Sequence, residues 1–117
     1  MAFDIDVLPS GEIFVAGEWR KGRGADIVST FPADRSLNRV VAGVSAEDVE
    51  EAIDRAAAAQ AAGWGEAKAQ ERAAVLHRIS EGIAANADRI SFIQSRDTGK
   101  TLAETRALAM SAAGTFR

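Results

Sequence analysis

The residue pattern changes once along this chain, near Val44, and that change constrains the fold more than any other feature. Before it, glycine is frequent and residues that favour β-strands occur in short runs. After it, alanine, glutamate and arginine are abundant, and apolar residues recur at the three- and four-residue spacing of α-helices. The sequence therefore predicts short strands and turns over residues 1–44, followed by about four helices over residues 45–117.

Two pairs of strands are predicted in the first part. Residues Glu12–Trp19 place apolar side chains on both sides of Ala16-Gly17, which indicates a short hairpin. A type I′ turn needs positive φ at both central positions, which alanine disfavours, so we expect a type II turn with Gly17 in its third position. Residues Asp26–Thr30 and Arg39–Ala42 predict two further strands on either side of the turn-rich sequence FPADRSLN. The basic loop Arg20–Arg23 is interpreted as a solvated turn.

Capping residues mark the ends of four helices in the second part. Ser45, followed by acidic residues, is an expected N-cap, and this helix should end before Gly63. A second helix is predicted over about Gln70–Ala85, and a third from about Asn86 to Gly99. The last follows the capping box T-x-x-E that begins at Thr101. The expected inward faces consist of Val49, Ile53 and Ala56, then Leu76, Ile79 and Ile83, then Ile90 and Ile93.

Composition excludes several classes of function. The chain has 117 residues, enough for one domain, and a net charge of −3, so there is no basic surplus to bind nucleic acid. It contains no cysteine, which excludes disulfides, thiolate metal ligands and a thiol nucleophile within it. The start, MAFDIDVLPSGE, lacks the features of a secretory signal, and no apolar run is long enough to span a bilayer. We therefore expect a cytoplasmic protein without nucleic-acid or membrane partners.

The stretch SRDTGKTLAETR, residues 95–106, contains fragments of two catalytic motifs. A phosphate-binding loop would need a glycine five residues before Gly99, where Gln94 stands, and a strand before it. An aspartic protease would need a second D-T-G and strand context. We interpret the stretch instead as a corner between two helices, with Gly99 ending one, Thr101 starting the next and Asp97 bonding backbone groups.

The order of short motifs along the chain resembles the N-terminal part of the aldehyde dehydrogenase superfamily. The resemblance runs from Ile13 to Arg117 and rests on F-V-x-G-E-W, F-P-A-D, S-A-E-D-V-E-E-A-I, E-R-A-x-x-L-x-R-I, D-T-G-K-x-x-x-E and A-A-G-T-F-R. Two departures affect turns: the family usually has N-P where Phe31-Pro32 stands, and often an asparagine where Ala16 stands.

The resemblance implies an α/β aldehyde dehydrogenase fold, with residues 1–117 as an incomplete N-terminal part of its cofactor-binding domain. Such enzymes oxidise an aldehyde to a carboxylic acid: a cysteine thiolate attacks the carbonyl, hydride passes to NAD or NADP, and a glutamate-activated water releases the acyl group. These groups are expected beyond residue 117, so we assign no catalytic or cofactor-binding residue here and expect the chain alone to be inactive and to bind no cofactor. Its expected partners are the remainder of the enzyme chain and, when complete, further copies in a homo-oligomer.

One local site follows from the resemblance. Some members bind a monovalent cation between the backbone near the F-P-like turn, here Thr30, and the aspartate of D-T-G-K, here Asp97. Oxygen ligands suit such a hard cation. The alternative is that Asp97 only bonds the backbone at the corner between the helices.

A second hypothesis treats the chain as a stand-alone, non-catalytic module that binds a partner through its apolar faces. The two hypotheses differ in what the isolated chain should look like. A fragment of an enzyme should leave apolar helix faces exposed and associate or become molten, whereas a stand-alone module should be compact and monomeric.

Overall fold

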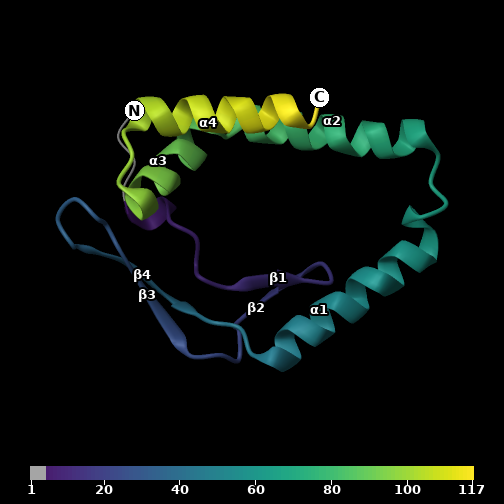
Figure 1. The fold of residues 1–117 in the computed structure, drawn as a ribbon, viewed down its shortest axis with the longest axis horizontal. Helices are drawn as coiled ribbons and strands as arrows, with labels where there is room; N and C mark the ends of the chain where they lie inside the picture. Colours follow the sequence, from purple (N-terminus) through teal and green to yellow (C-terminus); the bar gives the residue numbers. More distant parts are fainter. Residues whose placement is uncertain (1–4) are drawn as a thin grey trace. The chain divides into compact units, whose positions relative to one another are not determined.

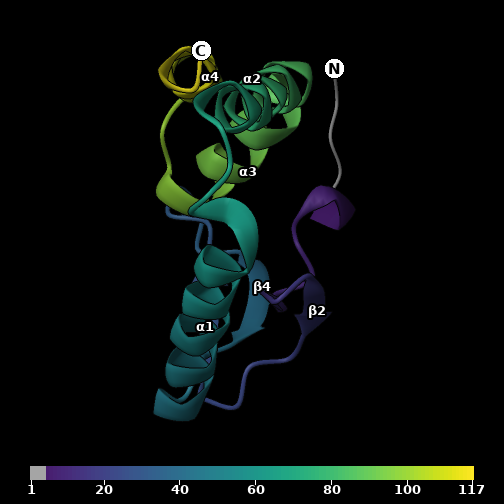
Figure 2. The ribbon, with the colours of Figure 1, turned by 90° about the vertical axis from the view of Figure 1, so that its right-hand side faces the viewer.

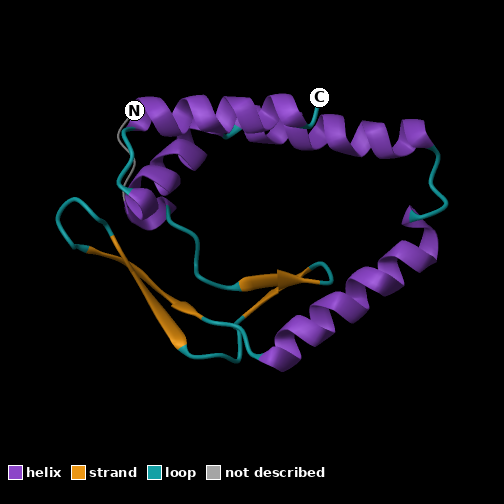
Figure 3. Ribbon diagram, in the orientation of Figure 1, coloured by secondary structure: helices purple, strands orange, loops and turns teal. Residues whose placement is uncertain are grey.

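The computed structural model describes residues 5–117 (Figure 1). Its strands and helices are shown in Figure 3 and follow the predicted order. They are β1 (Ile13–Val15), β2 (Glu18–Arg20), β3 (Asp26–Thr30), β4 (Leu37–Ala42), α1 (Ala46–Ala59), α2 (Ala69–Ala85), α3 (Ala87–Thr98) and α4 (Leu102–Thr115), with a 3₁₀ turn at Ile5–Val7 and a π-helical turn at Gln60–Trp64. The prediction of short strands followed by four helices is confirmed.

The chain divides into two compact units, each built from segments that are distant in sequence. Among the described residues, unit 1 contains residues 5–8, the segment Thr30–Asn38 and the segment Lys68–Arg117. Unit 2 contains the segments Pro9–Ser29 and Arg39–Ala67. Each unit therefore combines residues from the strand-rich and the helical parts of the sequence.

The first hairpin, β1–β2 in unit 2, has a different type of turn from the one expected from the sequence. The strands are antiparallel, with Phe14 opposite Trp19 and Val15 opposite Glu18. Ala16 has φ 54° and Gly17 has φ 86°, so φ is positive at both central positions, as in a type I′ turn. The expectation of a type II turn is wrong. Primed turns match the twist of the flanking strands, and this match offsets a cost of about 1–2 kcal/mol for holding alanine in the left-handed region.

The second strand pair, β3–β4, begins at a place where two backbones touch. β3 has the predicted bounds, and β4 begins two residues before the predicted Arg39. The Gly24 amide donates to the Gly43 carbonyl at 2.9 Å, and a Cβ on Gly24 would lie 2.4 Å from the Val44 carbonyl oxygen. Only glycine therefore fits at position 24 without a shift of the backbone.

Helix α1 starts where the sequence predicts and ends three residues before the predicted end at Ala62. Ser45 caps it, accepting from the Asp48 amide at 3.2 Å while the Asp48 carboxylate accepts from the Ser45 amide at 3.0 Å. The α-helix proper ends at Ala59, and the π-helical turn Gln60–Trp64 that follows contains Gly63, whose φ of 146° is not helical. The glycine thus ends the helical segment because other residues rarely adopt that conformation.

Helices α2, α3 and α4 of unit 1 lie side by side (Figure 2) and touch through small residues. Ala87, Ala109 and Ala113 are buried between them. The predicted corner is confirmed: Gly99 ends α3 with φ 76°, and Thr101 forms a capping box at the start of α4. Small side chains allow close approach of the helices but bury little apolar area.

Large apolar side chains remain exposed in both units. Ile53 is 62% exposed and Trp19 64% exposed, and the buried apolar residues of the described part are one leucine and four alanines. The described residues therefore leave the predicted faces of α1 and α2 largely open, with Ile83 of the α2 face half-buried. The exposed members of these faces are Val49, Ile53, Ala56, Leu76 and Ile79. Within residues 5–117 no helix is both long and apolar enough to cross a membrane.

Candidate functional site

The two residues of the predicted cation site belong to unit 1. Thr30 is the last residue of β3, and Asp97 lies in the last turn of α3. Both side chains are exposed. Between Thr30 and Asn38 the chain turns back, with the Phe31 amide donating to the Ser36 carbonyl at 2.9 Å. This turn is attached to the C-terminal end of α3.

Arg96 makes that attachment, and its role was not anticipated from the sequence. Its Nε donates to Asn38 Oδ1 at 3.0 Å and its Nη2 to Ser36 Oγ at 3.0 Å. The guanidinium carbon lies 4.2 Å from the centre of the Phe31 ring, a cation–π contact. In return, Asn38 Nδ2 donates to the Arg96 carbonyl at 2.9 Å. No motif links residues 58 positions apart, so sequence spacing could not reveal this contact.

Pro32 brings the F-P turn and the D-T-G-K corner together. A Cβ on Gly99 would lie 3.1 Å from the Pro32 Cβ, so the two segments are in contact. In the same turn, hydrogen bonds from the Ser36 side chain and backbone lower the pKa of Asp34. The described residues contain no group of three or more His, Cys, Asp or Glu side chains able to hold a metal. A cation at this corner would therefore depend on backbone carbonyls in addition to Asp97.

A second polar cluster surrounds Asp48 in unit 2. The buried Asp48 carboxylate accepts from Arg20 Nη1 at 2.7 Å, from Arg23 Nε at 2.6 Å and from the Arg23 amide at 2.7 Å. Glu51 Oε2 accepts from both arginines at 2.9 Å. Hydrogen bonds from the backbone of Arg23 and of Ser45, and then from Arg20, hold the pKa of Asp48 far below its usual range. Lys21 and Arg23 are exposed, as the interpretation of Arg20–Arg23 as a solvated turn implies, but Arg20 and Arg23 also pair with carboxylates of α1.

The start of α1 does not fit a dinucleotide phosphate. In dinucleotide-binding folds, free amides at a helix start that follows a strand bind the pyrophosphate. Here the amides of Ser45 and Asp48 are bound by each other's side chains. The buried carboxylate adds a negative charge at the same place. We therefore assign no cofactor contact to this helix end.

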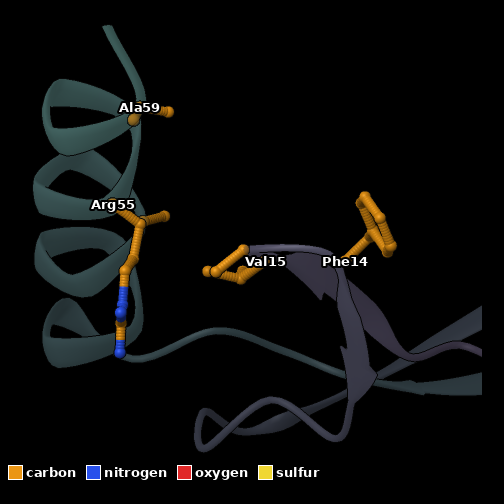
Figure 4. A pocket seen from close by; sticks show the side chains of 7 residues that line it. Phe14, Val15, Arg55 and Ala59 are labelled. Carbon is orange, nitrogen blue, oxygen red and sulfur yellow. The ribbon is translucent and has the colours of Figure 1, made fainter. Parts of the chain in front are cut away.

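Unit 2 also contains an apolar groove between β1 and α1, here called the β1–α1 groove (Figure 4). Its volume is about 230 Å³. In Figure 4 the Val15 side chain points toward α1, and the Arg55 side chain lies along the helix. Its lining consists of Phe14, Val15, Ala16, Ala52, Arg55, Ala56 and Ala59.

Comparison with known proteins identifies the family. The family model "Aldehyde dehydrogenase family" matches residues 19–117. The chain is 38% identical over 105 residues to N-succinylglutamate 5-semialdehyde dehydrogenase 2 of Caulobacter vibrioides, covering 90% of this chain and 21% of that protein. The chain therefore belongs to the aldehyde dehydrogenase family, and it spans about a fifth of the length of the curated relatives that it matches.

Solved structures agree with this assignment. The fold matches an aldehyde dehydrogenase of Brucella melitensis biovar abortus 2308 with a TM-score of 0.86 and 37% identity, covering 97% of this chain and 23% of that one. It also matches betaine aldehyde dehydrogenase of Staphylococcus aureus, solved with NAD+, with a TM-score of 0.82 and 25% identity, covering 96% of this chain and 25% of that one. The chain corresponds to the N-terminal part of these enzymes, which confirms the resemblance and gives no support to a stand-alone module.

Proposed function

We propose that this chain serves as the N-terminal part of the cofactor-binding domain of an NAD(P)-dependent aldehyde dehydrogenase, which oxidises an aldehyde to a carboxylic acid. The observation that carries the proposal is the family match over residues 19–117 combined with the length of the relatives, of which the chain spans about a fifth. The exposed apolar faces of both units support it, since such faces pack against further polypeptide in a complete enzyme.

In this proposal the chain supplies structure, and the reactive groups come from elsewhere in the enzyme. The chain contains no cysteine, so the thiolate that attacks the aldehyde belongs to other polypeptide. NAD or NADP, when bound there, accepts the hydride. The α1 start is closed by its own capping box, which supports a cofactor site outside this chain. The isolated 117-residue chain should accordingly neither oxidise aldehydes nor bind the cofactor.

We further propose a monovalent cation at the corner between Thr30 and Asp97. The contact of Pro32 with Gly99 supports it, because it brings the turn after Thr30 to the end of α3. The end of a helix carries a partial negative charge and free carbonyls, which favour a cation. Arg96 argues for the alternative, since its guanidinium already provides a positive charge at this corner and Asp97 then only bonds the backbone.

Thermal unfolding in matched salts separates these alternatives. A bound cation predicts a higher Tm in potassium or sodium chloride than in tetramethylammonium chloride at equal ionic strength, and loss of that difference in Asp97→Asn. Asp88→Asn is the control, because Asp88 pairs with Arg106 and lies outside the corner. An equal Tm in all three salts would leave Asp97 with the backbone-bonding role alone.

We also propose that the complete enzyme is a cytoplasmic homo-oligomer, as the resemblance and the sequence features lead us to expect. The remainder of the enzyme chain is then the first partner of this segment. Light scattering on the complete enzyme would test the oligomer; a monomer at micromolar concentration would contradict it.

A chimera tests the proposed function directly. Residues 19–117 would replace the matching segment of the Caulobacter vibrioides enzyme. We expect the chimera to reduce NAD+ or NADP+ when supplied with that enzyme's aldehyde, because the segment provides only packing surfaces. A chimera that folds, as judged by circular dichroism, but does not oxidise the aldehyde would contradict the proposal.

A further inference from the structure

The β1–α1 groove is an apolar channel with one charged wall residue. Along α1 its wall is made of Ala52, Ala56 and Ala59, whose spacing places them on one face of the helix. Because their side chains are small, they leave about 230 Å³ between the helix and β1. Val15 points into this space from the strand (Figure 4), and Arg55 is the charged residue of the lining.

Arg55 differs from the other arginines at α1. Arg20 and Arg23 are each paired with both Asp48 and Glu51. Glu51 lies one turn before Arg55, but its Oε2 already accepts from the two other arginines. Among the described residues, no carboxylate oxygen lies within 4.0 Å of the Arg55 guanidinium. The groove thus combines an apolar wall with a positive charge that has no ion-pair partner in residues 5–117.

The apolar surface continues beyond the groove on both walls. On the hairpin, Trp19 packs against Phe14 with 5.0 Å between ring centres and remains 64% exposed. On the helix, Val49 and Ile53 precede Ala56 by seven and three residues, so they lie on the adjoining surface, and Ile53 is 62% exposed. An apolar surface of this extent suits a polypeptide better than a small molecule. Trp and Arg are also the residue types enriched among energetically dominant interface contacts.

We propose that the β1–α1 groove binds a polypeptide segment that carries a bulky apolar side chain next to an aspartate or glutamate. Its source is the part of the aldehyde dehydrogenase outside this chain, so this inference rests on the proposed function. The apolar side chain enters between Val15 and the alanines of α1, and the carboxylate pairs with Arg55. Charge complementarity selects an acidic segment. The relative of which the matched 105 residues make up 21% is about four times as long as this chain, so a complete enzyme provides the polypeptide.

Peptide binding followed by methyl NMR tests the proposal on the 117-residue chain. The probes are acetyl-Gly-Leu-Glu-Leu-Gly-amide and the same peptide with Gln in place of Glu. We expect the Glu peptide to shift the methyl signals of Ala52, Ala56 and Ala59, and to bind about fivefold more tightly than the Gln peptide, as a partly desolvated ion pair would require. Arg55→Gln should remove that fivefold difference while weak binding of both peptides persists.

A matched pair of variants locates the site. Ala56→Leu fills the groove and should abolish the methyl shifts, whereas Ala58→Leu, exposed on the same helix and absent from the lining, should leave them unchanged. The proposal is overturned if neither peptide shifts these methyls, or if both bind equally. It is also overturned if hexanoate binds as tightly as the Glu peptide, because the groove would then bind a small carboxylate. The same holds if raising the concentration of the chain alone produces these shifts, because the groove would then bind a second copy of the chain. The activity of the chimera does not depend on these peptide measurements. Failure of the groove proposal can therefore be distinguished from failure of the proposed function.

Discussion

The two units bury polar groups of opposite kinds. In unit 2, the buried Asp48 carboxylate is surrounded by two guanidinium groups and two backbone amides. In unit 1, the buried polar groups between helices are hydroxyls: Ser91 Oγ and Thr105 Oγ1 lie 2.8 Å apart, and Ser80 Oγ donates to the Ala113 carbonyl at 2.8 Å. None of the groups in these two hydrogen bonds carries a formal charge.

The stability of each unit depends on the kind of polar group that it buries. A buried charge requires all of its partners, because removing one leaves a charge that is costly to bury. A buried hydroxyl that loses its partner costs far less. Unit 2 should therefore respond sharply to substitution and acid, whereas unit 1 should respond weakly.

Replacing Asp48 is expected to have the largest effect. Asp48→Ala leaves two backbone amides without their acceptor and leaves Arg20 and Arg23 with Glu51 as their remaining carboxylate partner. We expect residues 39–67 to lose protection against amide hydrogen exchange at 25 °C, while α3 and α4 remain protected. The control is Asp54→Ala, an exposed acid on the same helix, which should leave both units unchanged. Equal loss of protection in the two units would contradict the expectation that only unit 2 depends on a buried charge.

Acid should act on the same carboxylate. Hydrogen bonds from Arg23 and Ser45 lower the pKa of Asp48 in the folded state, so its contribution to stability is fully present above the unfolded carboxyl pKa of about 3.9 and is lost as pH falls below it. We expect protection in unit 2 to decline below about pH 4. Protection in unit 1 should decline less. Acid protonates exposed carboxylates there, such as the Glu104 carboxylate of the α4 cap, but it does not change the buried hydroxyls. A simultaneous decline in both units would contradict this account.

A methyl group at position 24 should also destabilise unit 2. In Gly24→Ala the new Cβ meets the Val44 backbone, so we expect a loss of about 3 kcal/mol in the free energy of unfolding, measured by urea denaturation. Gly82→Ala in α2 is the opposite case: it has open space around it and should gain about 1 kcal/mol from helix propensity. If Gly24→Ala leaves the free energy of unfolding unchanged, the backbones at Gly24 and Val44 separate at little cost.

Removing a buried hydroxyl in unit 1 should cost less. Thr105→Val keeps the volume but removes the contact with Ser91 and the bonds to the Thr101 and Leu102 carbonyls, for an expected loss of about 1–2 kcal/mol. Thr115→Val in the same helix removes an exposed hydroxyl and should change stability by less than about 0.5 kcal/mol. A loss as large as that of Asp48→Ala would erase the contrast between the units.

The smallest effect is expected in the first hairpin. Ala16 has positive φ, so Ala16→Gly should raise stability by about 0.5–1 kcal/mol. Gly17→Ala, which places a side chain at φ 86°, should lower it by a similar amount. Urea denaturation measures the change in the free energy of unfolding for both variants. A lower stability of Ala16→Gly would show that the turn is not strained.

Local signals in the sequence predicted most of the fold. The caps at Ser45 and Thr101, and the stop at Gly99, are read from neighbouring residues, and all three are confirmed. The turn at Ala16 was mistaken because the twist of the paired strands overrides the preference of a single residue. The faces predicted to point inward on α1 and α2 are mostly exposed in the structure, because spacing shows which residues share a face but not what covers it.

The polar contacts that join distant segments could not be predicted. Arg96 and Asn38 are 58 positions apart, and Arg20 and Glu51 are 31 apart, with no motif connecting them. Both arginines lie in segments that look solvated in isolation. Their partners are set by the path of the chain, which only the folded structure contains. The cation site at Thr30 and Asp97 remains a prediction.

If the exposed apolar faces of this chain are docking surfaces for the rest of an aldehyde dehydrogenase, the isolated chain should bind 8-anilinonaphthalene-1-sulfonate. We predict strong dye fluorescence with the 117-residue chain and its loss in the chimera, where the same faces are covered. A 117-residue chain that is monodisperse, is protected against amide hydrogen exchange and does not bind the dye would contradict the claim that its apolar faces are docking surfaces.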